Sequence, residues 1–246
     1  MIIDTHIHWP VTMNSDHKSF LQILDRFNID HVLLMGYEVL WKVGDVSECN
    51  DRLVEFCGKV PNRMSPLATV HLSEGERAVR EARRCLEKLK VCGFKFHPWV
   101  QGESFFREEM YEICRMAGEH GVPIVFHDGT PPYSLPSQIG LLAEMFPGTL
   151  FTLGHGGILF YWQEALETTK RYNNIIITLC GQHPWAMQKI CDQVAPDRIL
   201  FGTDFVGPGA EEYIAYRKGL VEGLKLPSEL REKIMSKNAQ RIFKLS

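Results

Sequence analysis

The 246-residue sequence lacks the marks of several protein classes. Its seven cysteines are scattered without a C-x-x-C pair, so their spacing indicates neither a disulfide framework nor a cysteine zinc site. Reduced thiols are typical of the cytosol, and we therefore expect a cytoplasmic protein. No apolar run approaches the roughly 18 residues of a membrane span, and no signal peptide is evident. We expect no membrane association.

An excess of charge of one sign is also missing. Lys and Arg number 27 against 30 Asp and Glu, a formal net charge of −3, which gives no electrostatic basis for binding nucleic acid. Apolar residues make up 45% of the chain and charged residues 23%, a composition typical of a globular protein with a sizeable core. A nucleotide-type glycine loop after an early strand is absent, which argues against a doubly wound open sheet.

What the sequence does contain is a regular alternation of strand and helix patterns. Nearly every β-branched or aromatic run precedes a helical pattern, such as residues 74–90 and 107–121. This alternation predicts parallel strands and an α/β fold, namely one (β/α)₈ TIM barrel over residues 1–246. Residues 227–245 predict two further C-terminal helices. The eight predicted strands are residues 1–8, 31–36, 64–70, 93–98, 123–129, 150–157, 174–180 and 198–204.

The first predicted strand carries an unusual number of polar side chains. Because successive side chains of a strand point to opposite faces, Ile3 and Ile7 lie on one face and Asp4, His6 and His8 on the other. We expect the isoleucines to contact the surrounding helices and the polar side chains to point into the barrel lumen. The histidines then lie near the carboxyl end of the strand, where the active sites of such barrels are found.

The same arrangement recurs at the ends of other predicted strands. Lys95 and His97 end the fourth strand, His127 the fifth, His155 the sixth and Asp204 the eighth. Imidazole nitrogens and a carboxylate are ligands that suit a divalent, zinc-like ion. The first, fifth and eighth strands can reach a common point because the eighth closes onto the first. Burying such groups without a metal would be costly, so the pattern predicts a metal site.

The motifs that carry these residues resemble the amidohydrolase superfamily. They are "DTHIH", "GFKFHP", "VFHDG", "LGHGG", "ILFGTDF" and the closing "SKNAQRIFKL", in that order over nearly the whole chain. The resemblance is to the amidohydrolase-related branch that includes aminocarboxymuconate semialdehyde decarboxylase and the dicarboxylate lactonases. As a set, these motifs are specific for the superfamily but say much less about the substrate.

The resemblance implies specific roles for the histidines and the aspartate. It makes His6, His8, His127 and Asp204 the ligands of one divalent metal ion, most often zinc. It also makes Asp204 and His155 catalytic, with Asp204 accepting a proton from a water activated by the metal. His155 would polarise the carbonyl of the substrate or stabilise its oxyanion.

Lys95 raises the question of a second metal, because binuclear relatives bridge two metals with a carboxylated lysine on the fourth strand. His97 occupies the outermost inward position of that strand, with Lys95 about two residues, roughly 6.6 Å, deeper. We therefore expect one metal, with a binuclear site as the less favoured alternative. We also expect Lys95 to pair with Asp4 in the layer beneath the metal.

The site predicts hydrolysis of an amide, lactone or similar carbonyl of a small molecule. The alternative is metal-dependent, non-oxidative decarboxylation of a small carboxylated substrate. Carboxylates usually require an arginine in the pocket, and only Arg52 and Arg107 follow strands on the active-site side. This scarcity favours hydrolysis. A non-enzymatic barrel with a structural metal is a third possibility, against which the extra His155 argues.

Other residues near the strand ends are expected to line the substrate pocket. The predicted substrate-binding residues are His97, Trp99, Thr130, His71 and Lys95. Residues after the fifth, sixth and seventh strands would either add an apolar and aromatic wall or serve as packing for long loops, namely Pro131, Tyr133, Phe160, Trp162 and His183. The expected partner is a small-molecule substrate, and a homodimer is an expectation from the family.

Overall fold

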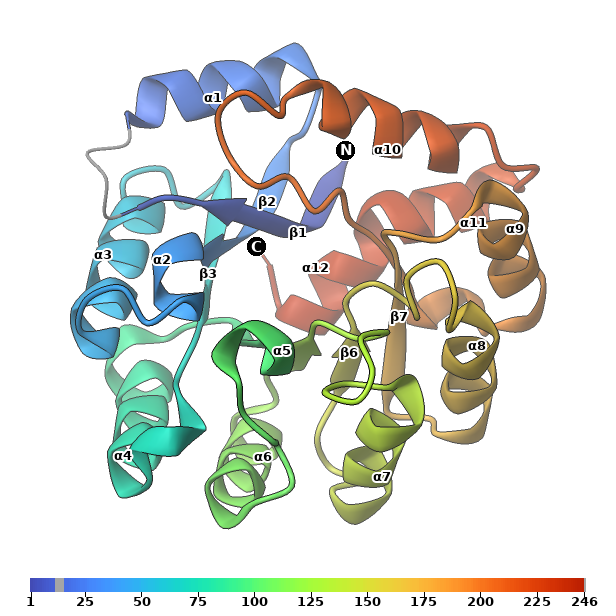
Figure 1. Ribbon diagram of the computed structural model, residues 1–246. Coiled ribbons are helices and arrows are strands. Elements are labelled where there is room, and N and C mark those ends of the chain that lie inside the picture. Colours follow the sequence, from blue (N-terminus) through green and yellow to red (C-terminus); the bar gives the residue numbers. More distant parts are fainter. Residues whose placement is uncertain (12–15, 246) are drawn as a thin grey trace.

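The computed structural model, which describes residues 1–11 and 16–245, is a barrel of eight parallel strands with helices around it (Figure 1). The strands follow one another around the sheet in chain order, as alternating strand and helix units require. All eight predicted strands are present. They are β1 (Ile3–Trp9), β2 (His31–Gly36), β3 (Met64–Ala68), β4 (Gly93–Phe96), β5 (Ile124–Phe126), β6 (Phe151–Leu153), β7 (Ile175–Leu179) and β8 (Ile199–Phe201).

The barrel closes where the last strand meets the first. The residues after β8 run beside β1, with a parallel bridge between Ile7 and Phe205. The His8 amide donates to the Phe205 carbonyl at 2.8 Å, and the Asp204 amide donates to the His6 carbonyl at 2.9 Å. Closure therefore brings the histidines of β1 next to the aspartate that follows β8. The predicted TIM barrel is confirmed.

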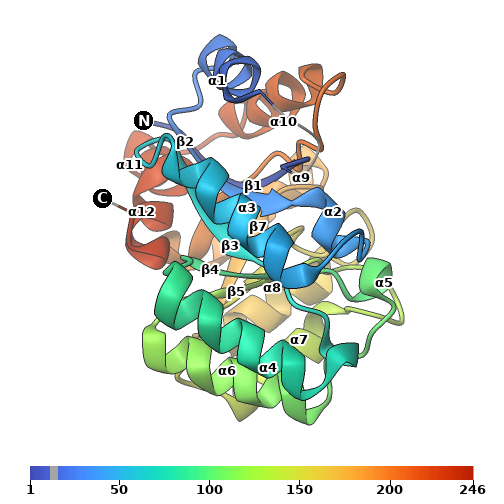
Figure 2. The same ribbon diagram turned by 90° about the vertical axis from the view of Figure 1, so that its left-hand side faces the viewer.

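Helices surround the strands on the outside, and Figure 2 shows α4 and α6 packed side by side. None of the helices in the described part of the chain is long and apolar enough to cross a membrane. The α-helices are α1 (His17–Arg26), α2 (Tyr37–Leu40), α3 (Val46–Gly58), α4 (Glu76–Arg84), α5 (Pro98–Gln101), α6 (Glu108–His120), α7 (Pro136–Met145), α8 (Trp162–Arg171), α9 (Pro184–Gln193), α10 (Glu212–Glu222), α11 (Ser228–Glu232) and α12 (Asn238–Phe243). Short 3₁₀ or π turns are η1 (Leu72–Glu74), η2 (Cys85–Leu89), η3 (Pro196–Arg198) and η4 (Lys233–Lys237).

Several strands are shorter than the sequence predicts, and their chemically active residues follow the strands. β5 ends at Phe126 and β6 at Leu153, so His127 and His155 begin the loops at the carboxyl end of the barrel. Asp204 comes three residues after β8, with a left-handed φ of 59°. This backbone conformation is uncommon for a residue other than glycine. It stops the strand geometry and turns the carboxylate towards β1.

β1 contains an irregularity that changes which side chains face the lumen. The register with β2 shifts between Asp4 and Ile7, so β1 has one residue more than its partner over this stretch. Ile3 packs in a cluster with Leu33 and Val125, which come from opposite sides of the barrel. Only the lumen can bring these strands together. The prediction that Ile3 faces the helices is therefore wrong, because the extra residue reverses the alternation.

The amino end of the lumen is filled by apolar side chains, which we call the lumen cluster. The C-terminal helix α12 covers this cluster with Ala239, Ile242 and Phe243. The helical run from Ser228 is interrupted only by the π turn η4 before α12 begins, which agrees with the predicted C-terminal helices. The strand members of the lumen cluster are Ile3, Leu33, Met35, Leu67, Val125, Ile176 and Leu200.

Candidate metal centre and active site

His6, His8 and Asp204 meet at the carboxyl end of the barrel and could hold a metal ion. One ligand atom from each lies within 4.8 Å of the other two. Asp204 Oδ1 is 3.6 Å from Nε2 of His6 and 3.6 Å from Nε2 of His8. Atoms bound about 2.0–2.2 Å from one tetrahedral ion lie roughly 3.3–3.6 Å apart, so this spacing fits a shared divalent ion. We call these residues the His6–His8–Asp204 cluster.

The electrostatics of this cluster also fit a cation. Burial lowers the pKa of both His6 and His8 well below the usual value, so both rings are neutral and each has one nitrogen with a lone pair. The Nδ1 atom of His6 is 3.1 Å from the Gly154 carbonyl, so Nδ1 carries the proton and the Nε2 lone pair points into the cluster. Burial raises the pKa of Asp204 to about 6, while the Lys95 charge opposes this shift.

His127, the fourth predicted ligand, lies beside the cluster but is not one of its three members. Its ring stacks on His97, with centroids 3.7 Å apart, and its Nε2 is 2.8 Å from the Thr130 hydroxyl. The His127 ring also meets the edge of His155 at a centroid distance of 4.3 Å. The structure thus gathers the two predicted pocket residues His97 and Thr130 around His127, whose role as a ligand stays a prediction.

His155 packs against the same group of rings. Its centroid lies 4.6 Å from that of His6, and its Nδ1 is 3.1 Å from the Cys180 carbonyl. Donation from Nδ1 to that carbonyl leaves Nε2 with the free lone pair. Burial lowers the pKa of His155 well below its usual value, so the ring is neutral. These contacts fix the orientation of the ring at the carboxyl end of the barrel, as a catalytic histidine requires.

Two residues that the sequence analysis missed hold the backbone around His155. Asp128 accepts hydrogen bonds from the amides of His155 at 2.7 Å and Gly157 at 2.6 Å. Gln182 donates from its side-chain amide to the His155 carbonyl at 2.7 Å. Burial raises the pKa of Asp128 to about 6. The sequence feature that could have indicated Asp128 is its position directly after His127 in "VFHDG".

Lys95 is fully buried and reaches the cluster directly. Its Nζ donates to Nε2 of His6 at 3.0 Å, so the amine is not in a deeper layer as predicted. Burial lowers the pKa of Lys95 to about 8, with the Asp204 charge opposing. The predicted pair with Asp4 is wrong. Asp4 instead accepts from Thr203, through its amide at 3.0 Å and its hydroxyl at 2.5 Å.

Asp4 joins β1 to the segment after β8, and so it has a structural role. Its Oδ1 also accepts from the His6 amide at 3.0 Å, which holds the backbone of the irregular part of β1. Burial raises the pKa of Asp4 to about 7, while the hydrogen bonds from Thr203 and His6 oppose the shift. The sequence predicts Lys95 as a charged partner of Asp4. In the closed barrel, the donors to Asp4 are instead the hydroxyl and amide of Thr203 and the amide of His6.

The other predicted pocket residues are divided between the carboxyl end and the supporting structure. Trp99 follows His97 in α5 and leaves 55% of its surface exposed, whereas His97 uses its Nδ1 to accept from the Val100 amide at 3.4 Å. His71 is buried and is not a member of the cluster. Its Nε2 is 2.6 Å from the Val39 carbonyl, and its Nδ1 is 3.6 Å from a carboxylate oxygen of Glu103. This geometry favours a structural role for His71.

Aromatic side chains are exposed in the segments that directly follow β4 to β7. Besides Trp99, they include Tyr133, Phe160 and Trp185, and Phe160 is 84% exposed. Trp162 of the predicted wall is buried instead and meets the edge of Trp185 at a centroid distance of 5.0 Å. The segments after four successive strands therefore present apolar rings at the end of the barrel that holds the histidines, with Trp99 in α5 and Trp185 at the start of α9.

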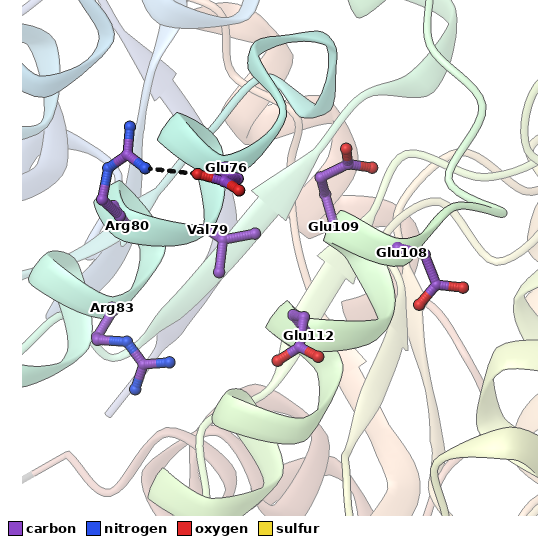
Figure 3. A pocket seen from close by; sticks show the side chains of 7 residues that line it. All are labelled: Glu76, Val79, Arg80, Arg83, Glu108, Glu109 and Glu112. Carbon is purple, nitrogen blue, oxygen red and sulfur yellow. Dashed lines mark hydrogen bonds and ion pairs between the residues drawn. The ribbon is translucent and has the colours of Figure 1, made fainter.

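Arg52 and Arg107, the two arginines singled out from the sequence, form local ion pairs. Arg52 lies 3.7 Å from Glu48 on the same helix, and Arg107 donates to Glu109 at 2.7 Å. A separate groove lies between α4 and α6 on the outer surface, lined by four glutamates, two arginines and Val79 (Figure 3). Within the groove Arg80 pairs with Glu76, whereas Arg83 pairs with Glu87 outside it, and the groove is distinct from the His6–His8–Asp204 cluster.

Comparison with known proteins identifies the class of this barrel. A family model described as Amidohydrolase matches residues 3–245, and the chain belongs to the amidohydrolase family. Among curated proteins, it is 23% identical over 207 residues to 2-keto-4-carboxy-3-hexenedioate hydratase from Sphingobium sp. (strain NBRC 103272 / SYK-6). That match covers 68% of this chain and 60% of the hydratase.

Solved structures with the same fold include two decarboxylases. The 5-carboxyvanillate decarboxylase of Sphingomonas paucimobilis has a TM-score of 0.77 and 14% identity, covering 100% of this chain and 99% of that one. A dihydroxybenzoic acid decarboxylase from Polaromonas sp. JS666 was solved with manganese and 2-nitroresorcinol; its TM-score is 0.75 and its identity 16%, covering 99% and 97%. These relatives agree with the branch to which the sequence motifs point.

Proposed function

We propose that this protein is a metal-dependent, non-oxidative decarboxylase of a small, planar, carboxylated substrate. The proposal rests on the reactions for which the relatives of this protein are named. The reactions are two decarboxylations and one hydration, and all three enzymes are named for carboxylated compounds. Decarboxylation, the alternative in the sequence analysis, therefore has better support than hydrolysis. The exposed aromatic rings at the carboxyl end suit a flat substrate.

The proposed cofactor is one divalent metal ion. His6, His8 and Asp204 would hold it, and manganese in the Polaromonas relative makes Mn²⁺ a candidate beside Zn²⁺. When bound, the ion would supply positive charge that orients the oxygen atoms of the substrate and stabilises negative charge on them. The neutral, buried imidazoles described above suit this role because an unprotonated ring nitrogen can bind a cation.

Decarboxylation requires a proton for the carbon atom that loses its carboxylate. In the cluster, the Asp204 side chain is 33% exposed, whereas that of His6 is only 1% exposed. Asp204 can therefore exchange protons with solvent, and we assign it the delivery of the proton. The new C–H bond forms from the π electrons of the substrate. The electron pair of the breaking carbon–carboxylate bond then restores the π system as CO₂ leaves.

His155 would orient the substrate beside this proton donor. Its Nδ1 is engaged with the Cys180 carbonyl, so only Nε2 can accept a hydrogen bond from a substrate hydroxyl. Replacing His155 by Asn is expected to reduce turnover roughly 10²–10³-fold, as for the loss of one preorganised hydrogen-bonding group. His31 provides the matched control, because it is also held by hydrogen bonds but lies at the amino end of β2. His31→Asn should leave turnover unchanged.

A direct assay tests the proposal. The purified protein would first be analysed for metal. Chelated and reloaded samples would then be incubated with 2,6-dihydroxybenzoate and 5-carboxyvanillate, the compounds for which two of its structural relatives are named. We expect CO₂ release that disappears on chelation and returns with Mn²⁺ or Zn²⁺. Turnover of lactones or amides, with no CO₂ from any carboxylated compound, would contradict the proposal and restore hydrolysis.

Hydration is the second candidate, because the curated relative is a hydratase. Addition of water across a carbon–carbon double bond beside a carboxylate needs the same positioned acid and base. The two reactions differ in their products. Loss of the ultraviolet absorbance of a conjugated enoate without CO₂ release would identify hydration, whereas stoichiometric CO₂ would identify decarboxylation.

A further inference from the structure

Arg217 is an arginine of the helix after β8 that reaches back towards the active-site end of the barrel. The chain turns from β8 into α10 at the carboxyl end, so α10 begins there and runs away from it. Side chains on a helix lean towards its N-terminus. Arg217 follows this rule, because its Nη2 donates to the Tyr213 hydroxyl one turn earlier, at 2.5 Å. The guanidinium carbon lies 4.8 Å from the centre of the Tyr213 ring.

The partners of Arg217 differ from those of most other arginines in the chain. Nine of the fourteen arginines lie within 4.0 Å of a carboxylate, and Arg198, Arg231 and Arg241 donate to backbone carbonyls. Within residues 1–11 and 16–245, Arg217 has no carboxylate partner, and its Nε is buried without any hydrogen-bond partner. A buried donor on a permanent cation is expensive to leave unpaired. The geometry suits an anion that completes the site.

Arg217 and Asp204 both follow β8, and α10 begins at the carboxyl end of the barrel, where the His6–His8–Asp204 cluster lies. Because the Arg217 side chain leans towards Tyr213 in the first turn of α10, its guanidinium is directed to that end of the barrel. Arg52 and Arg107 cannot serve in its place without breaking their ion pairs.

We propose that Arg217 binds a carboxylate of the substrate. This inference rests on the proposed function and adds the residue that selects for a carboxylated compound. A planar guanidinium can donate two parallel hydrogen bonds to a carboxylate, and Nε with one Nη forms such an edge. Tyr213 holds the guanidinium through Nη2 and packs against its face. The sequence analysis singled out only Arg52 and Arg107, which explains why recognition of a carboxylate looked poorly supported there.

Equilibrium binding to the metal-loaded, full-length protein tests this role without requiring turnover. Calorimetry would compare benzoate, 2,6-dihydroxybenzoate and muconate with resorcinol, which has the hydroxyls of 2,6-dihydroxybenzoate but no carboxylate. We expect Arg217→Met to weaken carboxylate binding roughly 10–150-fold, as for the loss of charged hydrogen bonds. Arg217→Lys should lose less. Resorcinol affinity should change less than about threefold in either variant.

Arg171→Met is the matched control. Arg171 also packs over a tyrosine, with its guanidinium carbon 5.2 Å from the Tyr172 ring, but it ends α8 at the far end of the barrel. Its replacement should leave every affinity unchanged. Equal carboxylate affinity in wild type and Arg217→Met would overturn the proposal, as would an equal loss for resorcinol or a wild type that binds none of the carboxylates. If binding depends on Arg217 but no CO₂ is released, the proposed decarboxylase function fails while this inference stands.

Discussion

The two ends of the barrel use the same strands but are stabilised by different interactions. At the amino end, Ile3 and the other members of the lumen cluster pack under Ile242 and Phe243 of α12. At the carboxyl end, the lumen holds imidazoles, the Lys95 amine and the Asp204 carboxylate. The amino end is closed by hydrophobic burial, whereas the carboxyl end depends on hydrogen bonds and charge.

This difference shows how one barrel separates stability from chemistry. Apolar packing at the amino end stabilises the fold without placing any reactive group. The polar residues at the carboxyl end are held by further polar contacts, such as those of Asp128 and Gln182 around His155. Residues at the two ends should therefore respond differently to substitution, to metal removal and to pH.

The largest expected effect is at the carboxyl end. Asp204→Asn keeps an oxygen donor but removes the carboxylate that we assign to proton delivery, so turnover should fall roughly 10²–10⁴-fold. Thermal unfolding and metal content should be measured on the same samples. Turnover close to that of the wild type, with metal retained, would show that Asp204 does not transfer the proton.

At the amino end, truncation should affect stability and leave chemistry alone. Phe243→Ala removes a buried ring from the cover of the lumen cluster and should lower the free energy of unfolding by about 3–5 kcal/mol. Phe160→Ala, at the exposed ring of a carboxyl-end loop, is the matched control and should change it by less than about 0.5 kcal/mol. Urea unfolding checks both values. A large loss of turnover per folded molecule in Phe243→Ala would break the comparison between the two ends.

A smaller effect should depend on pH. Glu81 of α4 accepts from Asn50 at 2.9 Å, Ser47 at 2.8 Å and Arg84 at 2.8 Å, and Asn50 in turn bonds to the backbone of Thr69 after β3. Burial raises the pKa of Glu81, but these hydrogen bonds outweigh it and hold the pKa below the usual 4.5. The ionised side chain therefore stabilises the folded protein above pH 4.5, and this contribution is lost as the pH falls through the lower folded-state pKa.

Glu81→Gln tests this assignment. We expect it to lower the free energy of unfolding by about 1–3 kcal/mol at pH 7, with the difference from wild type shrinking below pH 4.5. The corresponding difference for Phe243→Ala should stay constant over the same range, because no ionisable group is removed. Urea unfolding at several pH values measures both. A Glu81→Gln difference that does not change with pH would assign its effect to packing.

Much of this architecture could be predicted from the sequence because its signals are local. Short β-branched runs and amphipathic stretches predict the eight strands and the helices between them. His6 and His8 can be placed on one face because alternation operates over neighbouring residues. The strand ends were less predictable, since His127, His155 and Asp204 follow backbone turns rather than ending regular strands.

The sequence by itself therefore determined the barrel, the order of its elements and the chemical groups at its carboxyl end. Only the tertiary structure decided the direction of Ile3, the Thr203 partner of Asp4, the reach of Lys95 to His6 and the position of Arg217. These outcomes depend on an extra residue in β1 and on contacts between residues up to 199 positions apart. Such contacts form only when the barrel closes, so they cannot be predicted from a local pattern of residues.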